Sequence, residues 1–139
     1  MAEGMSDSTR EVLKGLRQHL LRLHKMLLDL ERVGYERARG PIGNSYEFLQ
    51  LALKDPWFDW LHRLSEMIVQ IDESLDVREG APVVTDDDAK ALIARAKSLL
   101  SPSETGSEFQ KNYFLAMQQS PDVVLLHSEL VKVFGREEN

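Results

Sequence analysis

Hydrophobic residues recur at alternating intervals of three and four near the start of the chain, which is the spacing of one face of an α-helix. The members of this stripe are Leu13, Leu16, Leu20, Leu23, Leu27 and Leu30. Ser8 and Glu11 form a capping-box pattern before it, and Gly40-Pro41 can stop a helix after it. The pattern predicts a helix from about residue 9 to residue 33 or beyond, long enough to be the spine of a bundle.

A second apolar stripe follows Asp55-Pro56, a pair that can cap a helix and occupy its first position. Its members, up to about residue 76, are Trp57, Trp60, Leu61, Leu64, Met67, Ile68, Ile71 and Leu75. Trp57 and Trp60 lie on the inward arc of this helix with the aliphatic residues. We therefore expect both indoles to be structural and not to stack on a ligand.

Turn and cap residues divide the rest of the chain into shorter helices. These are expected at about residues 45–54, 86–100, 108–119 and 121–134. Asn44 and Glu47 offer a second capping box for the first of them. No strand pattern competes with this interpretation. The expected fold is all-α, an antiparallel bundle of about five to six helices in which the short helix at 45–54 closes one end.

Length and composition indicate a soluble, single-domain protein. The chain has 139 residues, of which 42% are hydrophobic and 29% are charged, and no apolar run approaches the roughly 18 residues of a membrane span. We expect one domain at residues 8–134 between flexible tails at 1–7 and 135–139. The N-terminal residues do not resemble an export signal and there is no cysteine, so we expect a cytoplasmic location without membrane contact.

Charge is distributed unevenly along the chain. Residues 1–39 carry eight Lys/Arg against six Asp/Glu, whereas residues 40–139 carry nine against seventeen. An acidic protein repels phosphate backbones, and the basic residues of the first helix are partly neutralised by Glu11, Asp29 and Glu31. Nucleic-acid binding is therefore not expected.

The histidines and serines give little support to catalysis or metal binding. The four histidines, at 19, 24, 62 and 127, lack the Glu-x-x-His motif of dimetal bundles. His62, Glu66 and Glu73 are expected to face water, and the serines, Ser65 among them, have no base placed beside them by the sequence. We therefore expect no metal, no cofactor, no catalytic residue and no enzymatic activity.

Polar residues border the leucine stripe near the end of the first helix. At 100° per residue His24 and Glu31 lie within about 50° of the stripe centre, and Tyr35 follows one turn later. A buried Glu31 would need Tyr35, a Lys or Arg from another helix, or a ligand. Either these residues sit at the border with their polar ends in solvent, or they form a small polar pocket inside one end of the bundle.

The turn after the first helix is the second candidate. Arg37 and Arg39 offer planar donors, Asn44 and Tyr46 follow a flexible glycine turn, and exposed amides at a helix start can receive an anion. The same residue types also serve simple turns. The ligand-binding candidates are His24, Glu31, Tyr35, Arg37, Arg39, Asn44 and Tyr46.

The function we expect is non-catalytic protein–protein association, including a homodimer, because several apolar residues fall outside the main stripes. Leu21 and Leu28 lie about 80–100° from the leucine seam, and Phe58 and Val69 lie beyond the second stripe. The homodimer is expected to form through the face of the first helix that carries Leu21 and Leu28. All four residues can instead meet other helices of the same chain. The alternative function is a ligand- or metal-binding bundle with a polar pocket at the end of the first helix.

Overall fold

The computed structural model describes residues 4–138, and this part of the chain is helical without a strand. The all-α prediction is confirmed. The elements are α1 (Asp7–Arg39), α2 (Ser45–Lys54), the 3-10 helix η1 (Pro56–Leu61), α3 (His62–Ser74), α4 (Asp86–Leu99), α5 (Glu108–Gln119) and α6 (Pro121–Glu138).

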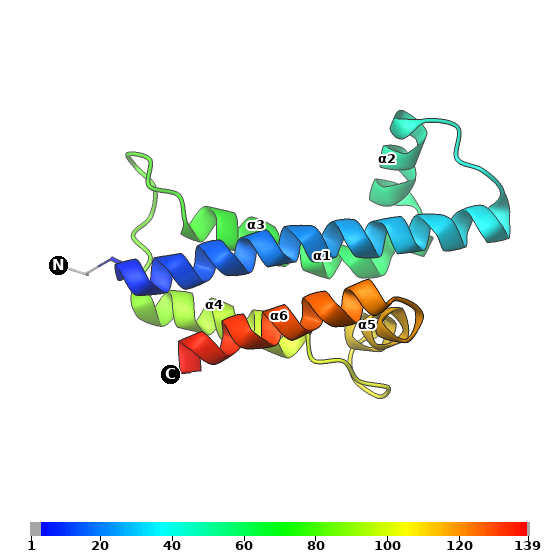
Figure 1. Ribbon diagram of the computed structural model, residues 1–139. Coiled ribbons are helices and arrows are strands. Elements are labelled where there is room, and N and C mark those ends of the chain that lie inside the picture. The colour runs from blue at the N-terminus through cyan, green and yellow to red at the C-terminus, as the bar shows by residue number, and fades with distance from the viewer. Residues whose placement is uncertain (1–3, 139) are drawn as a thin grey trace.

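The spine α1 runs the length of the molecule, with α3, α4 and α6 alongside it (Figure 1). Its buried positions include the predicted leucines from Leu13 to Leu27. They pack with aliphatic and aromatic residues of the neighbouring helices in one hydrophobic core. Helix α1 therefore supplies the central stripe around which the bundle closes.

The start of α1 differs from the prediction. Ser6, and not Ser8, is the N-cap, because its hydroxyl accepts a hydrogen bond from the Thr9 N–H at 3.2 Å. Ser8 lies inside the helix, so the capping box at Ser8 and Glu11 is wrong. The Ser6 N–H donates to the Asp86 carboxylate at 2.7 Å, which ties the start of α1 to α4. Of the predicted tail at 1–7, residues 1–3 lie outside the described residues.

The predicted third helix begins as the 3-10 helix η1. The Asp55 carboxylate accepts from the Trp57 N–H at 2.9 Å, and Pro56 occupies the first position, as the sequence indicates. A 3-10 helix turns about 120° per residue, so residues three apart share a face. Phe58 and Leu61 are therefore both buried. Of the two alternatives for Phe58, the structure shows the one in which it packs within its own chain.

Helix α1 ends at the turn that the sequence indicates, whereas helix α6 extends beyond its expected end. Helix α1 stops at Gly40, whose φ of 94° is a conformation that glycine adopts readily. Helix α6 continues to Glu138, beyond the predicted end near Phe134, because Gly135 alone does not break it. Residue 139 of the predicted tail at 135–139 lies outside the described residues.

Helix α2 lies at the end of the bundle where α1 finishes, and it stands away from the long helices (Figure 1). It contacts mainly η1, where the Phe48 ring meets Phe58 edge to face at 5.9 Å between centroids. None of its residues is fully buried. The short helix is therefore placed at one end, as predicted, but much of its surface remains uncovered.

Candidate functional site

His24 and Glu31, the polar residues predicted at the border of the leucine stripe, lie against α3 and η1. His24 Nε2 and Ser65 Oγ share a hydrogen bond of 2.9 Å, which joins α1 to α3. Burial lowers the pKa of the His24 imidazole, and the nearby His62 lowers it further. A neutral imidazole therefore forms this link at neutral pH.

Ser65 has a base beside it after all, which corrects the expectation from sequence. A serine nucleophile also requires a group that orients the base and a space for substrate. In the described part of the chain, no hydrogen bond or ion pair joins His24 to a carboxylate, and none of the five cavities described below is lined by His24 or Ser65. The pair is best explained as a bridge between helices.

Glu31 is half-buried and lies near the indoles of η1. Burial raises the pKa of its carboxyl group, and hydrogen bonding from Trp57 and Trp60 lowers it in part. The Trp57 Nε1–H is buried without a partner of good geometry, so its contact with the carboxylate is weak. Among the described residues no ion pair reaches the Glu31 carboxylate, so neither predicted protein partner, Tyr35 or a cation, is found, and a ligand as partner stays a prediction.

Tyr35 and Arg39 belong to a cluster of aromatic and cation–π contacts between α1 and η1. The Tyr35 ring meets Trp57 edge to face at 5.7 Å and Phe58 at 5.8 Å. The Arg39 guanidinium lies 5.6 Å from the Tyr35 ring and 5.7 Å from Trp57 and pairs with Asp55 at 3.8 Å. These contacts fix the direction in which the chain leaves α1.

The remaining predicted residues lie in or near α2. Arg37 is exposed, and Asn44 caps α2 by accepting from the Glu47 N–H at 2.9 Å. The Glu47 carboxylate accepts from the Gly43 N–H at 2.9 Å and not from Asn44, so the predicted capping box is only half formed. Tyr46 is 70% exposed.

The seven candidate residues do not line a common cavity. Of the five cavities described, none is lined by His24, Glu31 or Tyr35, whereas Tyr46 borders an open depression of about 480 Å³ beside α2. No group of three histidine or acidic residues in the described chain is arranged to hold a metal ion. A ligand role for the seven residues stays a prediction.

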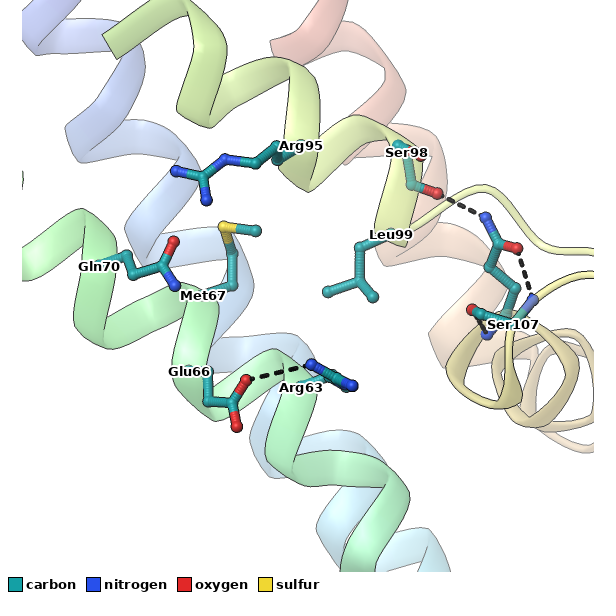
Figure 2. Close-up of a pocket in the computed structure, with 9 residues that line it drawn as sticks. Arg63, Glu66, Met67, Gln70, Arg95, Ser98, Leu99 and Ser107 are labelled. Carbon is teal, nitrogen blue, oxygen red and sulfur yellow. Dashed lines mark hydrogen bonds and ion pairs between the residues drawn. The ribbon is translucent and has the colours of Figure 1, made fainter. Parts of the chain in front are cut away.

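A groove between α3 and α4 is the larger concave feature, and the sequence did not indicate it. It consists of two adjoining cavities of about 440 and 700 Å³ that share Gln70 and Arg95. Arg95 reaches from α4 toward Gln70 and Met67 of α3 (Figure 2). Gln70 Oε1 is buried and has no hydrogen-bond partner in the part of the chain that the structure describes. The lining residues belong to two helices far apart in sequence, so no local pattern predicts them.

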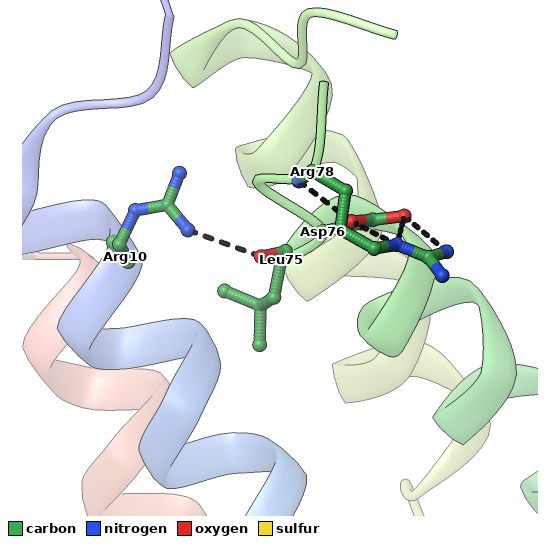
Figure 3. A network of polar contacts seen from close by, with 4 residues as sticks. All are labelled: Arg10, Leu75, Asp76 and Arg78. Atoms are coloured by element: carbon green, nitrogen blue, oxygen red, sulfur yellow. Dashed lines mark hydrogen bonds and ion pairs between the residues drawn. The ribbon is translucent and has the colours of Figure 1, made fainter. Parts of the chain in front are cut away.

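The loop that closes one end of this groove is held by a polar network (Figure 3). Arg10 of α1 donates to the Leu75 carbonyl at 3.4 Å, at the end of α3. The backbone N–H and the guanidinium group of Arg78 both donate to the Asp76 carboxylate, at 2.9 and 2.8 Å. These hydrogen bonds lower the pKa of Asp76 to about 2. The network connects the α3–α4 loop to the spine.

The apolar face predicted on α1 is smaller than expected. Arg17 contacts Asp72 at 3.4 Å and His24 contacts Ser65, so Leu21 and Val69 lie between these two cross-links on their helices. Leu21 is 50% and Val69 52% exposed. Leu28 packs against the core of its own chain and is only partly exposed.

Helix α2 exposes a more continuous apolar stripe. Tyr46, Leu49 and Leu53 occupy positions i, i+3 and i+7 and are 70%, 53% and 57% exposed. The opposite side of α2 packs on the core through Phe48 and Leu51. Helical spacing on both sides of this short helix was visible in the sequence, but the number of neighbouring helices available to cover it was not.

The fold and these surfaces define an all-helical bundle with one projecting amphipathic helix. No family model matches the sequence, and neither the curated proteins nor the solved structures include a significant match. None of the described helices has the length and apolar character needed to cross a membrane.

Proposed function

We propose that this protein acts without catalysis, by protein–protein association, and that it forms a homodimer through α2. The observation that carries the proposal is the stripe of Tyr46, Leu49 and Leu53, three large apolar side chains on one face of a helix that stands away from the bundle. The cytoplasmic location expected from the composition is part of the same proposal.

The size of the stripe supports association. Fully burying a large apolar side chain contributes about 1.5–3 kcal/mol, so covering the exposed half of each residue contributes about 1 kcal/mol. Aromatic and leucine side chains at i, i+3 and i+7 are also the usual anchors of a helix that lies in a groove. The stripe can therefore provide the apolar centre of an interface.

The proposal is tested by the mass of the purified protein in solution. Light scattering across concentrations should show a dimer that dissociates on dilution, and the double variant Leu49→Ser, Leu53→Ser should remain monomeric at high micromolar concentration. Leu21→Ser is the matched control, because Leu21 is about as exposed as Leu49 but lies on α1. It should leave the dimer intact.

Two results would contradict the proposal. A wild-type protein that stays monomeric at high micromolar concentration would exclude self-association. A dimer lost in Leu21→Ser but kept in the α2 double variant would move the interface to the α1 face expected from the sequence.

A further inference from the structure

We propose that α2 of one chain docks into the groove between α3 and α4 of a second copy, and that the second copy returns the contact. This inference rests on the proposed self-association through α2, and it assigns the surface that receives the helix. The groove is the concave feature shown in part in Figure 2.

The groove has the apolar floor that the α2 stripe requires. Met67 and Leu92 are buried at its base and Leu99 is half-buried along its wall. Within α3 the lining runs from Arg63 to Ser74. At 1.5 Å per residue this is about 17 Å, slightly longer than the roughly 15 Å of the ten-residue α2. The receiving surface is therefore long enough for the whole helix.

Free charges on α2 and in the groove are complementary. Lys54 of α2 and Glu73 of the groove make no ion pair within the described residues, and Arg95 makes none either. Glu47 lies near the other end of α2, with one carboxylate oxygen accepting from Gly43. Each end of α2 thus carries the charge opposite to one part of the groove.

One alignment matches these groups together. When α2 lies parallel to α3 with Lys54 beside Glu73, Glu47 falls about 10.5 Å away, at the level of Glu66. That position lies between Arg63 and Arg95. Arg63 is already paired with Glu66 at 3.7 Å, so Arg95 is the guanidinium group left for Glu47.

The same alignment supplies the missing partner of Gln70. Gln50 of α2 then lies at the level of residue 69, next to the buried Gln70 Oε1, which has no hydrogen-bond partner among the described residues. This oxygen is covered in the free chain, so the Gln70 side chain must turn toward the groove before the Gln50 amide can donate to it. Satisfying this acceptor then favours the docked state.

Reciprocal docking follows from the area that a stable interface needs. Specific interfaces bury about 1,200–2,000 Å² in total, and one ten-residue helix in one groove covers only part of that. A two-fold dimer uses the same contact twice and leaves neither α2 stripe exposed.

Charge exchange tests the pairing. Lys54→Glu and Glu73→Lys should each weaken the dimer by about tenfold in dissociation constant, because an attraction becomes a repulsion. The double variant Lys54→Glu, Glu73→Lys should restore affinity to within about threefold of wild type. Lys132→Glu, an equal charge change at an exposed position on α6, should have no effect. Sedimentation equilibrium gives the constants, and circular dichroism verifies that each variant is folded.

The outcomes separate this inference from the proposed function. If Leu49→Ser, Leu53→Ser abolishes the dimer but the charge variants leave its affinity unchanged, the groove is wrong and association through α2 stands. Additive weakening without rescue in the double variant also overturns the pairing. Assembly beyond a dimer overturns the reciprocal arrangement, and a monomeric wild type overturns both proposals.

Discussion

Glu31 places a carboxylate where burial disfavours its charge. The indoles of Trp57 and Trp60 offset this only in part, so the pKa of Glu31 remains above its ordinary value. A carboxyl group whose pKa is raised on folding contributes its stability at low pH and loses it as the pH rises through the unfolded and then the folded pKa. The ionised form therefore reduces stability at neutral pH.

The substitution Glu31→Gln should stabilise the protein at pH 7 by a few tenths of a kcal/mol, or about 1–2 °C in Tm, because it keeps an acceptor for the indoles and removes the charge. The advantage should shrink as the pH falls to about 4. Thermal unfolding followed by circular dichroism measures it. A variant clearly less stable than wild type at pH 7 would show that the carboxylate has a stronger partner than the two indoles.

His24 makes a pH-dependent contribution of the opposite sense. Burial and the nearby His62 lower the pKa of His24 in the folded state. The stability that His24 contributes to the fold is therefore complete above the unfolded pKa of about 6.5, and it is lost as the pH falls through that value toward the folded pKa. Tm should drop between pH 7 and pH 5.5. His24→Gln should reduce this drop by about 1–3 °C. Part of the drop should remain, because burial lowers the pKa of His127 in the same direction. Equal drops in variant and wild type would refute the contribution.

At the scale of elements, one glycine within α1 and one directly after it have opposite roles. Gly40 ends the helix at φ 94° and ψ 171°, a region that is nearly restricted to glycine, whereas Gly15 lies within the helix and an added Cβ there meets nothing within 4 Å. Gly40→Ala should cost about 1–3 kcal/mol. Gly15→Ala should stabilise by about 0.5–1 kcal/mol.

Denaturant unfolding of the two alanine variants measures both effects in the same helix. Because the substitution is identical, a difference in sign reports the backbone conformation and not the added methyl group. Equal effects at the two positions would mean that Gly40 is not required to end α1.

Helix positions were predictable because apolar spacing and turn residues are local. The bounds of α5 agree with the expectation from sequence, and Asn44 caps α2 as expected. The sequence predicted one continuous α-helix after Asp55-Pro56, and it did not show that the first turns are the 3-10 helix η1, in which Phe58 is buried. At α1 several serines compete as caps, and the contact of Ser6 with Asp86 of α4 favours the earlier start.

The site was less predictable because its contacts cross between helices. Periodicity identified His24 and Glu31 as border residues. Their neighbours Ser65, Trp57 and Trp60 depend on how η1 and α3 pack against α1. The groove around Gln70 and Arg95 depends on the separation between α3 and α4. One-dimensional spacing contains no information on that separation.

At the scale of the whole molecule, the bundle buries its own spine but leaves α2 uncovered. Helices α3, α4 and α6 pack around the leucines of α1, whereas α2 turns Phe48 and Leu51 toward the core. Self-association through α2 would cover the remaining stripe without altering the core. The protein would then function as a rigid helical scaffold that presents one helix to a second copy.

Hydrogen exchange at two protein concentrations tests this account most directly. On raising the concentration from well below to well above the dimer dissociation constant, amides of α2 should exchange more slowly, together with those of α3 and α4 around the groove, because docking restricts local opening. Amides of α1 near Leu21 should not change. Exchange in α2 that is independent of concentration in a protein shown to dimerise, or slowing confined to α1, would contradict the account.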